Sequence, residues 1–564
     1  MALSRVLEIG RLRRSALILL MIAMLTALLA DAQVQSPDTY PGNAISGTVV
    51  NSVTREPVGR ALVYTSDERY AAFTDDHGHF ELNVAEQAPA PGAAGMPTTQ
   101  TVLQVKKPGF LTMAGPRAGT SAVPRQSDLT LKLVPEGLIV GRVKFPSAEA
   151  ADRVQVQLYR REIRDGYARW EQSAQTTTRA DGEFRFADLR AGDYKLFSLE
   201  STERDPLTTV PNGPVFGFPP RYFAAARDFA SADTIHVLAG ETIAAEIAPE
   251  RLKYYDVRVP VVSADPSPQQ GLQVSVYAQG HRGPGFALGY DPNQRAIRGS
   301  LPNGSYTVEA ASFQPGAATG VANITVANGP VNAPPLIMAP NVSIEINVRQ
   351  DVAAGENPAA ASGPYVTLQS AEDVTVENGS RDTYQSDQNP PVLAGVAPGR
   401  YWVEVHPTAS GMYAASVTSG GKDLFRTPLV VPYGASVAPI DITVRYDGAQ
   451  IEATLEGAGS GSSVPAAIPA GRSNRFQPGT GPVVYCVPLE GDGGVARALP
   501  PQFDGTYVLP QLAPGDYRIL AFDTPQELEY HNPAAMRAYE TKGQVVHLTP
   551  GQKLQVQLQP IRNE

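Results

Sequence analysis

Short runs of alternating apolar and polar residues fill most of the chain, with turn residues between them. Two examples are Leu129-Thr-Leu131-Lys-Leu133 and Leu554-Gln-Val556-Gln-Leu558. Alternation with a period of two is typical of strands that bury one face. The 51 glycines and 50 prolines concentrate at the turns between these runs. The pattern therefore predicts an all-β fold of many short strands.

A phrase that ends in glycine, any residue and tyrosine occurs four times before an alternating run. Its glycine and tyrosine are Gly192 and Tyr194, Gly304 and Tyr306, Gly399 and Tyr401, and Gly515 and Tyr517. The tyrosines are 112, 95 and 116 residues apart, which is the length of one β-sandwich domain. The glycine suits a turn with positive φ, and the tyrosine can bury its ring and bond its hydroxyl to nearby backbone as a tyrosine corner.

The repeat predicts a tandem array of five β-sandwich modules after a leader segment. We name them module 1 (residues 43–135), module 2 (136–252), module 3 (253–340), module 4 (341–447) and module 5 (448–564). At roughly 100 residues each, such modules bury enough surface to have independent cores. The chain is thus expected to be an array of similar folding units.

Modules 1, 2 and 5 resemble the carboxypeptidase regulatory-like domain. The resemblance is carried by Gly47-x-Val49 and Thr74-Asp75-x-x-Gly78-x-Phe80 in module 1, by Ala180-Asp181-Gly182-Glu-Phe184 in module 2, and by Phe503-Asp504-Gly505-x-Tyr507 in module 5. It implies a transthyretin-like (prealbumin-like), Ig-like β-sandwich of the kind found in many bacterial secreted proteins. Modules 3 and 4 keep mainly the glycine-x-tyrosine corner. Such a resemblance concerns the fold and implies little about function.

The first residues have the pattern of a secretory signal peptide. Arg11, Arg13 and Arg14 precede an apolar run over residues 15–30, and Ala30-Asp31-Ala32 offers a small-x-small cleavage pattern. We expect residues 1–32 to be removed by cleavage after Ala32 and the protein to be periplasmic or extracellular. A retained anchor is the alternative. No second apolar span follows, so no integral membrane segment is expected after cleavage.

The chain is acidic, with a formal net charge of −10. The leader carries four arginines against Glu8 and Asp31, a net of +2, so the mature chain is at −12. An acidic chain without basic clusters argues against nucleic acid as a partner. Cys486 is the one cysteine, so no internal disulfide can form, and its apolar run predicts a buried side chain.

We predict that the protein is not an enzyme and has no metal or cofactor. None of the seven histidines is followed three places on by glutamate, so the zinc ligands of a metallocarboxypeptidase are missing. His77 and His79 lie beside Asp75 and Asp76, which could in principle cluster around a metal. The turn that Asp75 and Gly78 provide is the favoured interpretation of this segment.

Four loop aromatics are the candidate ligand-binding residues: Tyr167, Trp170, Tyr222 and Phe223. Tyr167 and Trp170 fall in a hairpin-like segment of module 2, and the other two fall in a loop predicted over residues 205–228. An exposed aromatic ring can stack on a sugar or pack against a partner peptide. The alternative is that these rings cover the ends of their own sandwich. Trp402 follows Tyr401, so it should point to the opposite face of its strand.

Three more irregular stretches are predicted as loops or helix. Residues 351–364 and 456–482 are rich in small residues and read as long loops. A short helix is expected over residues 532–541, with Asn532 as its cap and Pro533 in its first turn, covering one edge of module 5.

From these features the sequence predicts a non-enzymatic extracytoplasmic binding or scaffold protein whose partner is an unknown envelope protein or glycan. One alternative is a carbohydrate-binding protein that uses the loop aromatics of module 2. A second alternative is a hydrolase with an unrecognised site.

Overall fold

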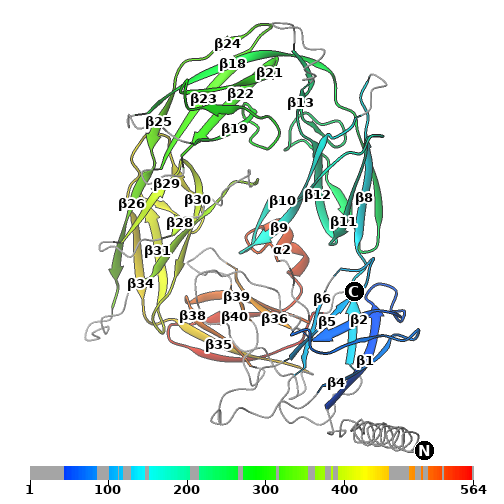
Figure 1. The fold of residues 1–564 in the computed structure, drawn as a ribbon. Helices are drawn as coiled ribbons and strands as arrows, with labels where there is room; N and C mark the ends of the chain where they lie inside the picture. Colours follow the sequence, from blue (N-terminus) through cyan, green and yellow to red (C-terminus); the bar gives the residue numbers. More distant parts are fainter. Residues whose placement is uncertain are drawn as a thin grey trace, which may run out of the picture. The chain divides into compact units, whose positions relative to one another are not determined.

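A computed structural model describes residues 43–65, 67–84, 101–111, 113–118, 129–146, 151–202, 215–263, 271–312, 317–352, 363–374, 383–384, 391–456, 482–489, 497–499, 506–523, 526 and 528–561. In this part of the chain the fold is all-β, as the sequence predicts, and it contains nine sheets. Figure 1 shows the strands in sequence colours. The predicted signal peptide lies outside the described residues.

The chain groups into two compact units. One consists of Met1–Val49, Pro57–Leu103 and Ala118–Leu131, and the other of Val50–Glu56, Gln104–Arg117 and Lys132–Glu564. Modules 2 to 5 therefore belong to a single unit. Within it, each of four core clusters draws its buried residues from one predicted module. The bounds of the five modules remain a prediction.

Module 1 contains two sheets, in the strand orders β4-β1-β7 and β3-β2-β5-β6. Alternation is clear in β4, whose burial follows a strict exposed–buried pattern that puts Phe80 and Leu82 inside. The strands are β1 (Asn43–Asn51), β2 (Leu62–Thr65), β3 (Ala71–Phe73), β4 (His79–Val84), β5 (Thr101–Lys106), β6 (Met113–Ala118) and β7 (Leu129–Leu133).

Module 2 contains the sheets β11-β8-β17 and β10-β9-β12-β15, with β16 pairing β12. Its core includes Ile139, Phe184 and Tyr194. The strands are β8 (Gly137–Val143), β9 (Gln155–Arg164), β10 (Tyr167–Thr177), β11 (Glu183–Leu189), β12 (Gly192–Ser198), β13 (Ser201–Thr202), β14 (Val215–Phe218), β15 (Arg221–Tyr222), β16 (Ile235–Val237) and β17 (Thr242–Ile247). Part of the loop predicted over residues 205–228 is thus strand, because β14 pairs with β18 (Leu252–Ser263) and β15 pairs with β12.

Module 3 belongs to a ten-stranded sheet that begins in module 2. Strand β14 pairs with β18, so main-chain hydrogen bonds join the two modules. The module's strands are β18 (Leu252–Ser263), β19 (Gln273–Ala278), β20 (Gly289–Asp291), β21 (Ala296–Pro302), β22 (Gly304–Ala311), β23 (Ala318–Val326), β24 (Val331–Asn332) and β25 (Leu336–Pro340).

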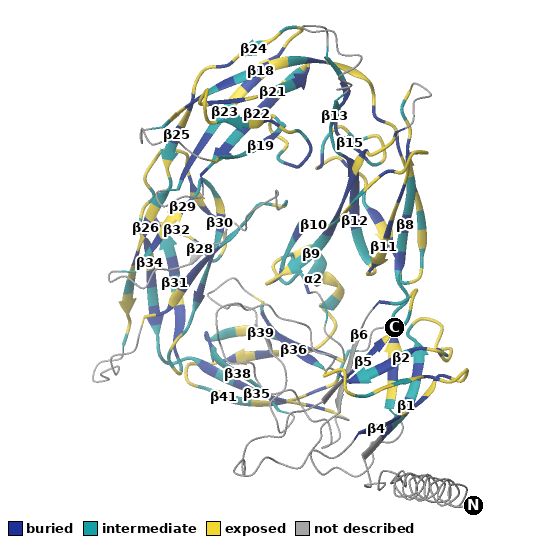
Figure 2. Ribbon diagram, viewed as in Figure 1, coloured by how far each residue is buried: buried dark blue, intermediate teal, exposed yellow. Residues whose placement is uncertain are grey.

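Module 4 contains the sheets β29-β26-β34-β31-β32 and β28-β27-β30-β33 around one core. Burial alternates along β30, in which Tyr401, Val403 and Val405 are buried and the residues between them are intermediate. Figure 2 draws buried residues dark blue and intermediate residues teal. The strands are β26 (Val342–Gln350), β27 (Tyr365–Ser370), β28 (Thr383–Tyr384), β29 (Val392–Val396), β30 (Gly399–His406), β31 (Tyr413–Ser419), β32 (Lys422–Asp423), β33 (Leu429–Val431) and β34 (Ile440–Arg445).

Module 5 contains the sheets β38-β35-β41 and β37-β36-β39-β40, and Cys486 is fully buried in its core, as predicted. The predicted helix is confirmed but short: Asn532 accepts the Ala534 N–H at 3.0 Å. Its elements are β35 (Ala449–Leu455), β36 (Val483–Pro488), β37 (Arg497–Leu499), β38 (Tyr507–Leu512), β39 (Gly515–Phe522), α2 (Pro533–Met536), η1 (Arg537–Tyr539), β40 (Gln544–Leu548) and β41 (Lys553–Leu558).

The four repeated tyrosines form the predicted corners. Tyr194, Tyr306, Tyr401 and Tyr517 are at most 3% exposed. Each hydroxyl donates to the carbonyl oxygen four residues earlier, at 2.6, 2.9, 2.8 and 2.8 Å respectively. A hydrogen bond satisfies each buried hydroxyl and ties the turn to the strand that follows.

The corner glycines follow the prediction at three of four places. Gly192, Gly399 and Gly515 have φ between 147° and 156°, whereas Gly304 is not in the positive-φ region. A Cβ at Gly304 would instead lie 2.8 Å from the Tyr306 hydroxyl oxygen. Close approach of the tyrosine, not backbone torsion, therefore accounts for the glycine in module 3.

Modules 1 and 2 share a second turn of the same construction. Thr74 accepts the Ala61 N–H, and Thr178 accepts the Val154 N–H, each at 2.9 Å. Gly78 and Gly182, four residues after these threonines, have φ of 75° and 80°. Asp75 accepts the backbone N–H groups of His77 and His79, and the His79 bond is the main cause that lowers the pKa of its carboxyl. Asp75 thus serves the turn, as the favoured interpretation has it.

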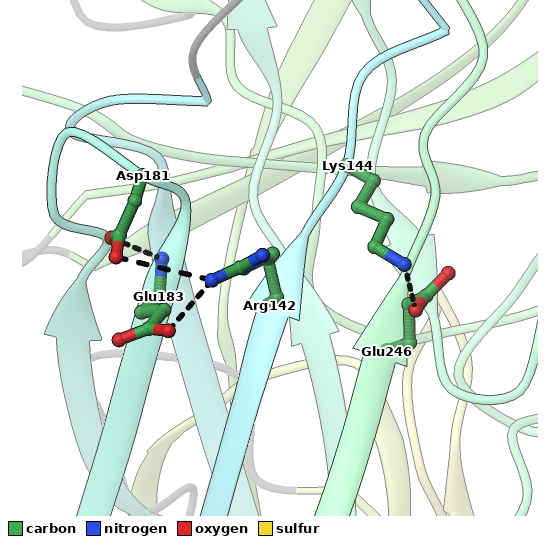
Figure 3. A network of polar contacts seen from close by, with 5 residues as sticks. All are labelled: Arg142, Lys144, Asp181, Glu183 and Glu246. Atoms are coloured by element: carbon green, nitrogen blue, oxygen red, sulfur yellow. Dashed lines mark hydrogen bonds and ion pairs between the residues drawn. The ribbon is translucent and has the colours of Figure 1, made fainter.

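A row of charged residues covers the outer face of the β11-β8-β17 sheet (Figure 3). Arg142 lies 2.7 Å from Glu183, and Lys144 lies 2.5 Å from Glu246, all about half exposed. These pairs join neighbouring strands on the solvent face while the apolar residues face the core.

Candidate functional site

The β9–β10 hairpin carries two of the predicted site residues at its tip. Its turn is Asp165-Gly166, with φ of 48° and 78°. Two positive φ values are typical of a type I′ turn, which matches the twist of the flanking strands and favours Asp-Gly. Tyr167 pairs with Arg164 directly after the turn, and Trp170 follows on the same strand.

Tyr167 packs between aromatic rings of two other modules. Its ring lies 4.8 Å from the Trp402 ring of module 4 and 4.1 Å from the His531 ring of module 5, with interplanar angles of 16° and 10°. Both stacked faces are therefore occupied within the chain. Trp402 points away from the core that holds Tyr401, as predicted, and meets the hairpin instead.

Polar groups hold the hairpin tip to modules 4 and 5. The backbone N–H of Trp170 donates to the backbone carbonyl oxygen of Asp373 at 2.8 Å. The Gln369 side chain donates through Nε2 to Asp165 Oδ2 at 3.0 Å. Arg161 Nη2 lies 2.7 Å from Glu529 Oε2, with the Glu529 side chain 13% exposed. A half-buried, hydrogen-bonded ion pair is less screened by solvent than the exposed pairs of the sheet faces.

Gly166 allows the closest approach at this contact. A Cβ at this position would lie 2.3 Å from the Tyr530 ring, and the Gly166 carbonyl oxygen accepts the His531 N–H at 3.3 Å. The positive φ and the lack of a side chain are both needed here.

Ionisation at the tip follows from burial. Burial raises the pKa of Tyr167, so its hydroxyl stays protonated at neutral pH. His531 is an exposed residue as a whole, yet its ring stacks on Tyr167 and lies 4.8 Å from the Tyr530 ring. Burial of the ring lowers the pKa of His531 to about 4, so a neutral imidazole is favoured in the docked hairpin.

Trp170 packs on a buried lysine of its own module. The Lys195 ammonium lies 5.1 Å from the Trp170 ring and 5.0 Å from the Phe229 ring. It also donates to the carbonyl oxygens of Phe229 and Ala230 at 2.8 and 3.0 Å. Burial lowers the pKa of Lys195, while the ring faces and carbonyl oxygens offset part of the cost of burying the charge.

Tyr222 and Phe223 lie away from the tip. Tyr222 is 4% exposed and packs in an aromatic cluster with Tyr159, Phe197 and Phe229. Its hydroxyl donates to the Pro284 carbonyl oxygen of module 3. Phe223 is half-buried against the core of module 2. Trp170 packs against the same cluster through the Phe229 ring, at 6.1 Å, whereas Tyr167 stacks on rings of modules 4 and 5.

The alternative interpretation, that these rings cover their own sandwich, describes Tyr222 and Phe223 but not Tyr167, whose ring contacts modules 4 and 5. A role of the four residues in ligand binding stays a prediction. Sequence reasoning did not single out Gly166, Lys195, Glu529 or His531. The Asp165-Gly166 dipeptide is a hairpin signal that could have located the tip.

A cavity of about 290 Å³ lies at the contact of the hairpin with modules 4 and 5. Its wall includes Arg169, Arg400, Glu372, Asp373 and Trp402. The wall carries both signs of charge, and Arg400 already lies 3.9 Å from Glu372. The charges of the wall therefore favour neither a cation nor an anion in the cavity.

Within the ranges that the structure describes, no group of three or more His, Cys, Asp or Glu side chains could hold a metal ion. No helix among the same residues is long and apolar enough to cross a membrane.

The chain matches no protein-family model and no curated protein. It is similar to several solved structures. The TIE protein of Bacillus anthracis is 10% identical, with 81% of this chain and 72% of that chain covered and a TM-score of 0.15. The minor pilin of Streptococcus agalactiae is 10% identical, with coverage of 37% and 96% and a TM-score of 0.18. A major pilin subunit of Bacillus cereus is 12% identical, with coverage of 55% and 98% and a TM-score of 0.14. At such identities and TM-scores these likenesses carry no inference about function.

Proposed function

We propose that the protein is a non-enzymatic extracytoplasmic scaffold whose modules are held in a fixed arrangement to present binding surfaces to an envelope protein or glycan. One observation carries the proposal: the hairpin tip of module 2 contacts modules 4 and 5. Domains that are joined only by small interfaces move relative to one another by default. A contact that links three modules opposes such motion, so it supports a fixed arrangement over a flexible string. We place the scaffold in the periplasm or outside the cell, on the basis of the leader segment.

Module 1 and module 2 are also proposed to be carboxypeptidase regulatory-like domains. The shared Thr-to-Gly turn, with Thr74 and Thr178 at equivalent places, supports this assignment.

The proposal is tested by measuring the distance between two modules in solution. Spin labels at Arg185→Cys on β11 and Ser343→Cys on β26 occupy exposed positions of modules 2 and 4. Cys486 is fully buried, so it need not be removed. Pulsed electron paramagnetic resonance should give one narrow distance distribution, and Tyr167→Ala should broaden it because the ring stack is lost.

The matched control is Tyr70→Ala, which removes a half-buried tyrosine of module 1 and should leave the distribution narrow. A distribution as broad in the unmutated chain as in Tyr167→Ala would contradict the scaffold proposal.

A further inference from the structure

The first and last strands of modules 2, 4 and 5 are neighbours in one sheet and run parallel. The pairs are β8 with β17, β26 with β34, and β35 with β41. The registers run from Leu138↔Thr242 to Val143↔Ile247 in module 2 and from Gln450↔Lys553 to Leu455↔Leu558 in module 5. The chain therefore enters such a module at one end of the pair and leaves it at the other end.

The same hydrogen bond closes each of the three pairs at its far end. The residue after the first strand donates its N–H to a carbonyl oxygen of the last strand at 2.9 Å. These bonds are Lys144 to Ile247, Asp351 to Val444, and Glu456 to Leu558. The ladders are therefore bonded over their whole length, with evenly spaced parallel bonds.

Side chains protect the ladders on one face and connect the strands on the other. Buried residues such as Ile451, Val556 and Leu558 cover the inner face in module 5. On the outer face, side-chain bonds cross between the two strands: Lys144–Glu246 in module 2 (Figure 3), Asn347–Asp441 in module 4, and Gln555–Glu452 in module 5.

The parallel arrangement decides how a pulling force acts on each pair. The start of the first strand and the end of the last strand lie at opposite ends of a parallel pair. Tension between them slides one strand along the other, so all the hydrogen bonds of the ladder are loaded together. In an antiparallel pair the same two points lie at one end, and tension opens the bonds one after another.

We propose that the chain bears tension along its length, and that the parallel terminal-strand pairs of modules 2, 4 and 5 carry this load in shear. The one cysteine leaves the chain no internal disulfide with which to bypass the ladders. This role goes beyond scaffolding and does not depend on the docked hairpin, since each pair lies inside one module.

The test pulls module 5 of the full chain in two directions by single-molecule force spectroscopy. Handles at Gln450→Cys and Gln559→Cys load β35 and β41 in shear. Handles at Glu456→Cys and Gln559→Cys instead pull at neighbouring ends of the two strands, where Gln559 Nε2 donates to Glu456 Oε2 at 3.1 Å, and peel the pair apart. Cys486 is fully buried and does not take a handle.

The two variants share one handle and the same folded module, so they differ only in the direction of the force. We expect the rupture force in shear to exceed the peeling force about twofold or more at equal loading rate. Equal forces in the two directions, or a lower force in shear, would overturn the proposal. Equilibrium unfolding by urea should give the same midpoint for both variants, which confirms that each is folded.

Discussion

The four corner tyrosines and Tyr167 use the same side chain in opposite ways. Each corner hydroxyl bonds to backbone four residues earlier, so the interaction is local and recurs in modules 2 to 5. Tyr167 stacks on rings of two other modules, and its contact occurs once. The corners stabilise single modules, while the hairpin tip contacts two other modules.

Two free energies can therefore be measured separately: that of unfolding one module, and that of docking the hairpin on modules 4 and 5. Loss of a corner should lower the free energy of unfolding of its module and leave the docking of the hairpin unchanged. Loss of the tip contact should release the hairpin while every core stays intact. Variants of the corners and of the tip should therefore differ in which of the two free energies they change, with the largest effect at a corner.

The largest effect is expected for Tyr401→Ala in module 4. The side chain is fully buried in the core, and truncating a buried aromatic costs about 3–5 kcal/mol of stability. Tyr401→Phe keeps the ring and loses the bond to Ala397, so it should cost about 1 kcal/mol. Urea unfolding measures both. A Phe variant as unstable as the Ala variant would show that the hydroxyl, not the ring, carries the corner.

Gly166→Ala should undock the hairpin. The new Cβ would lie 2.3 Å from the Tyr530 ring, and the positive φ adds about 1–2 kcal/mol of strain. The chain has two tryptophans, and both Trp170 and Trp402 lie at the tip contact. Their fluorescence emission should therefore shift to longer wavelength.

The control for that experiment is Gly280→Ala. Gly280 has φ of 82°, and a Cβ there would have nothing within 4 Å, so the backbone strain is the same without the clash. Its emission should match that of the unmutated chain. A shift of equal size in both variants would mean that strain alone, and not the contact with Tyr530, explains the change.

A smaller effect is expected from acid. The docked hairpin holds the pKa of His531 near 4, below its ordinary value of 6.5. The released state therefore binds the proton more tightly. The stabilisation of docking is complete above pH 6.5 and is lost as the pH falls toward 4, so tryptophan emission should shift over that window.

His531→Phe keeps a flat ring but cannot titrate. Its emission should change less between pH 6.5 and 4 than that of the unmutated chain. If the two profiles coincide, His531 does not control the pH response.

The smallest effect is expected for the exposed pairs of the sheet faces. Lys144→Ala removes the partner of Glu246, and both side chains are about half exposed. Pairs of this kind contribute between 0 and about 1 kcal/mol, and the stability of module 2 should change by no more than about 0.5 kcal/mol. A larger loss by urea unfolding would place the Lys144–Glu246 pair among the contacts that determine stability.

The sequence predicted the corners and the strands because both depend on neighbours along the chain. Alternation identifies which residues of β4 face inward, and the glycine before each tyrosine marks the turn. The cap by Asn532 is local in the same sense. The α2 helix nevertheless ends at Met536, earlier than predicted, since η1 follows it with tighter turns.

The partners of the hairpin tip could not be predicted in the same way. Gln369, which bonds to Arg169, lies 200 residues further along the chain, and Glu529 lies 368 residues after Arg161. No periodicity connects such positions. The strands within residues 205–228 were missed for a related reason: Phe216 and Phe218 look like loop aromatics until β18 is available to pair with β14.

The docking of the hairpin also sets an order of biosynthesis. Module 2 can complete its core soon after residue 247 leaves the ribosome, because its cluster needs nothing later. Its tip must wait until His531, more than 280 residues afterwards, has been synthesised. Closure of this contact is thus a late event of maturation, and a chain truncated before residue 529 would keep intact early modules and a hairpin tip that lacks its contacts with module 5.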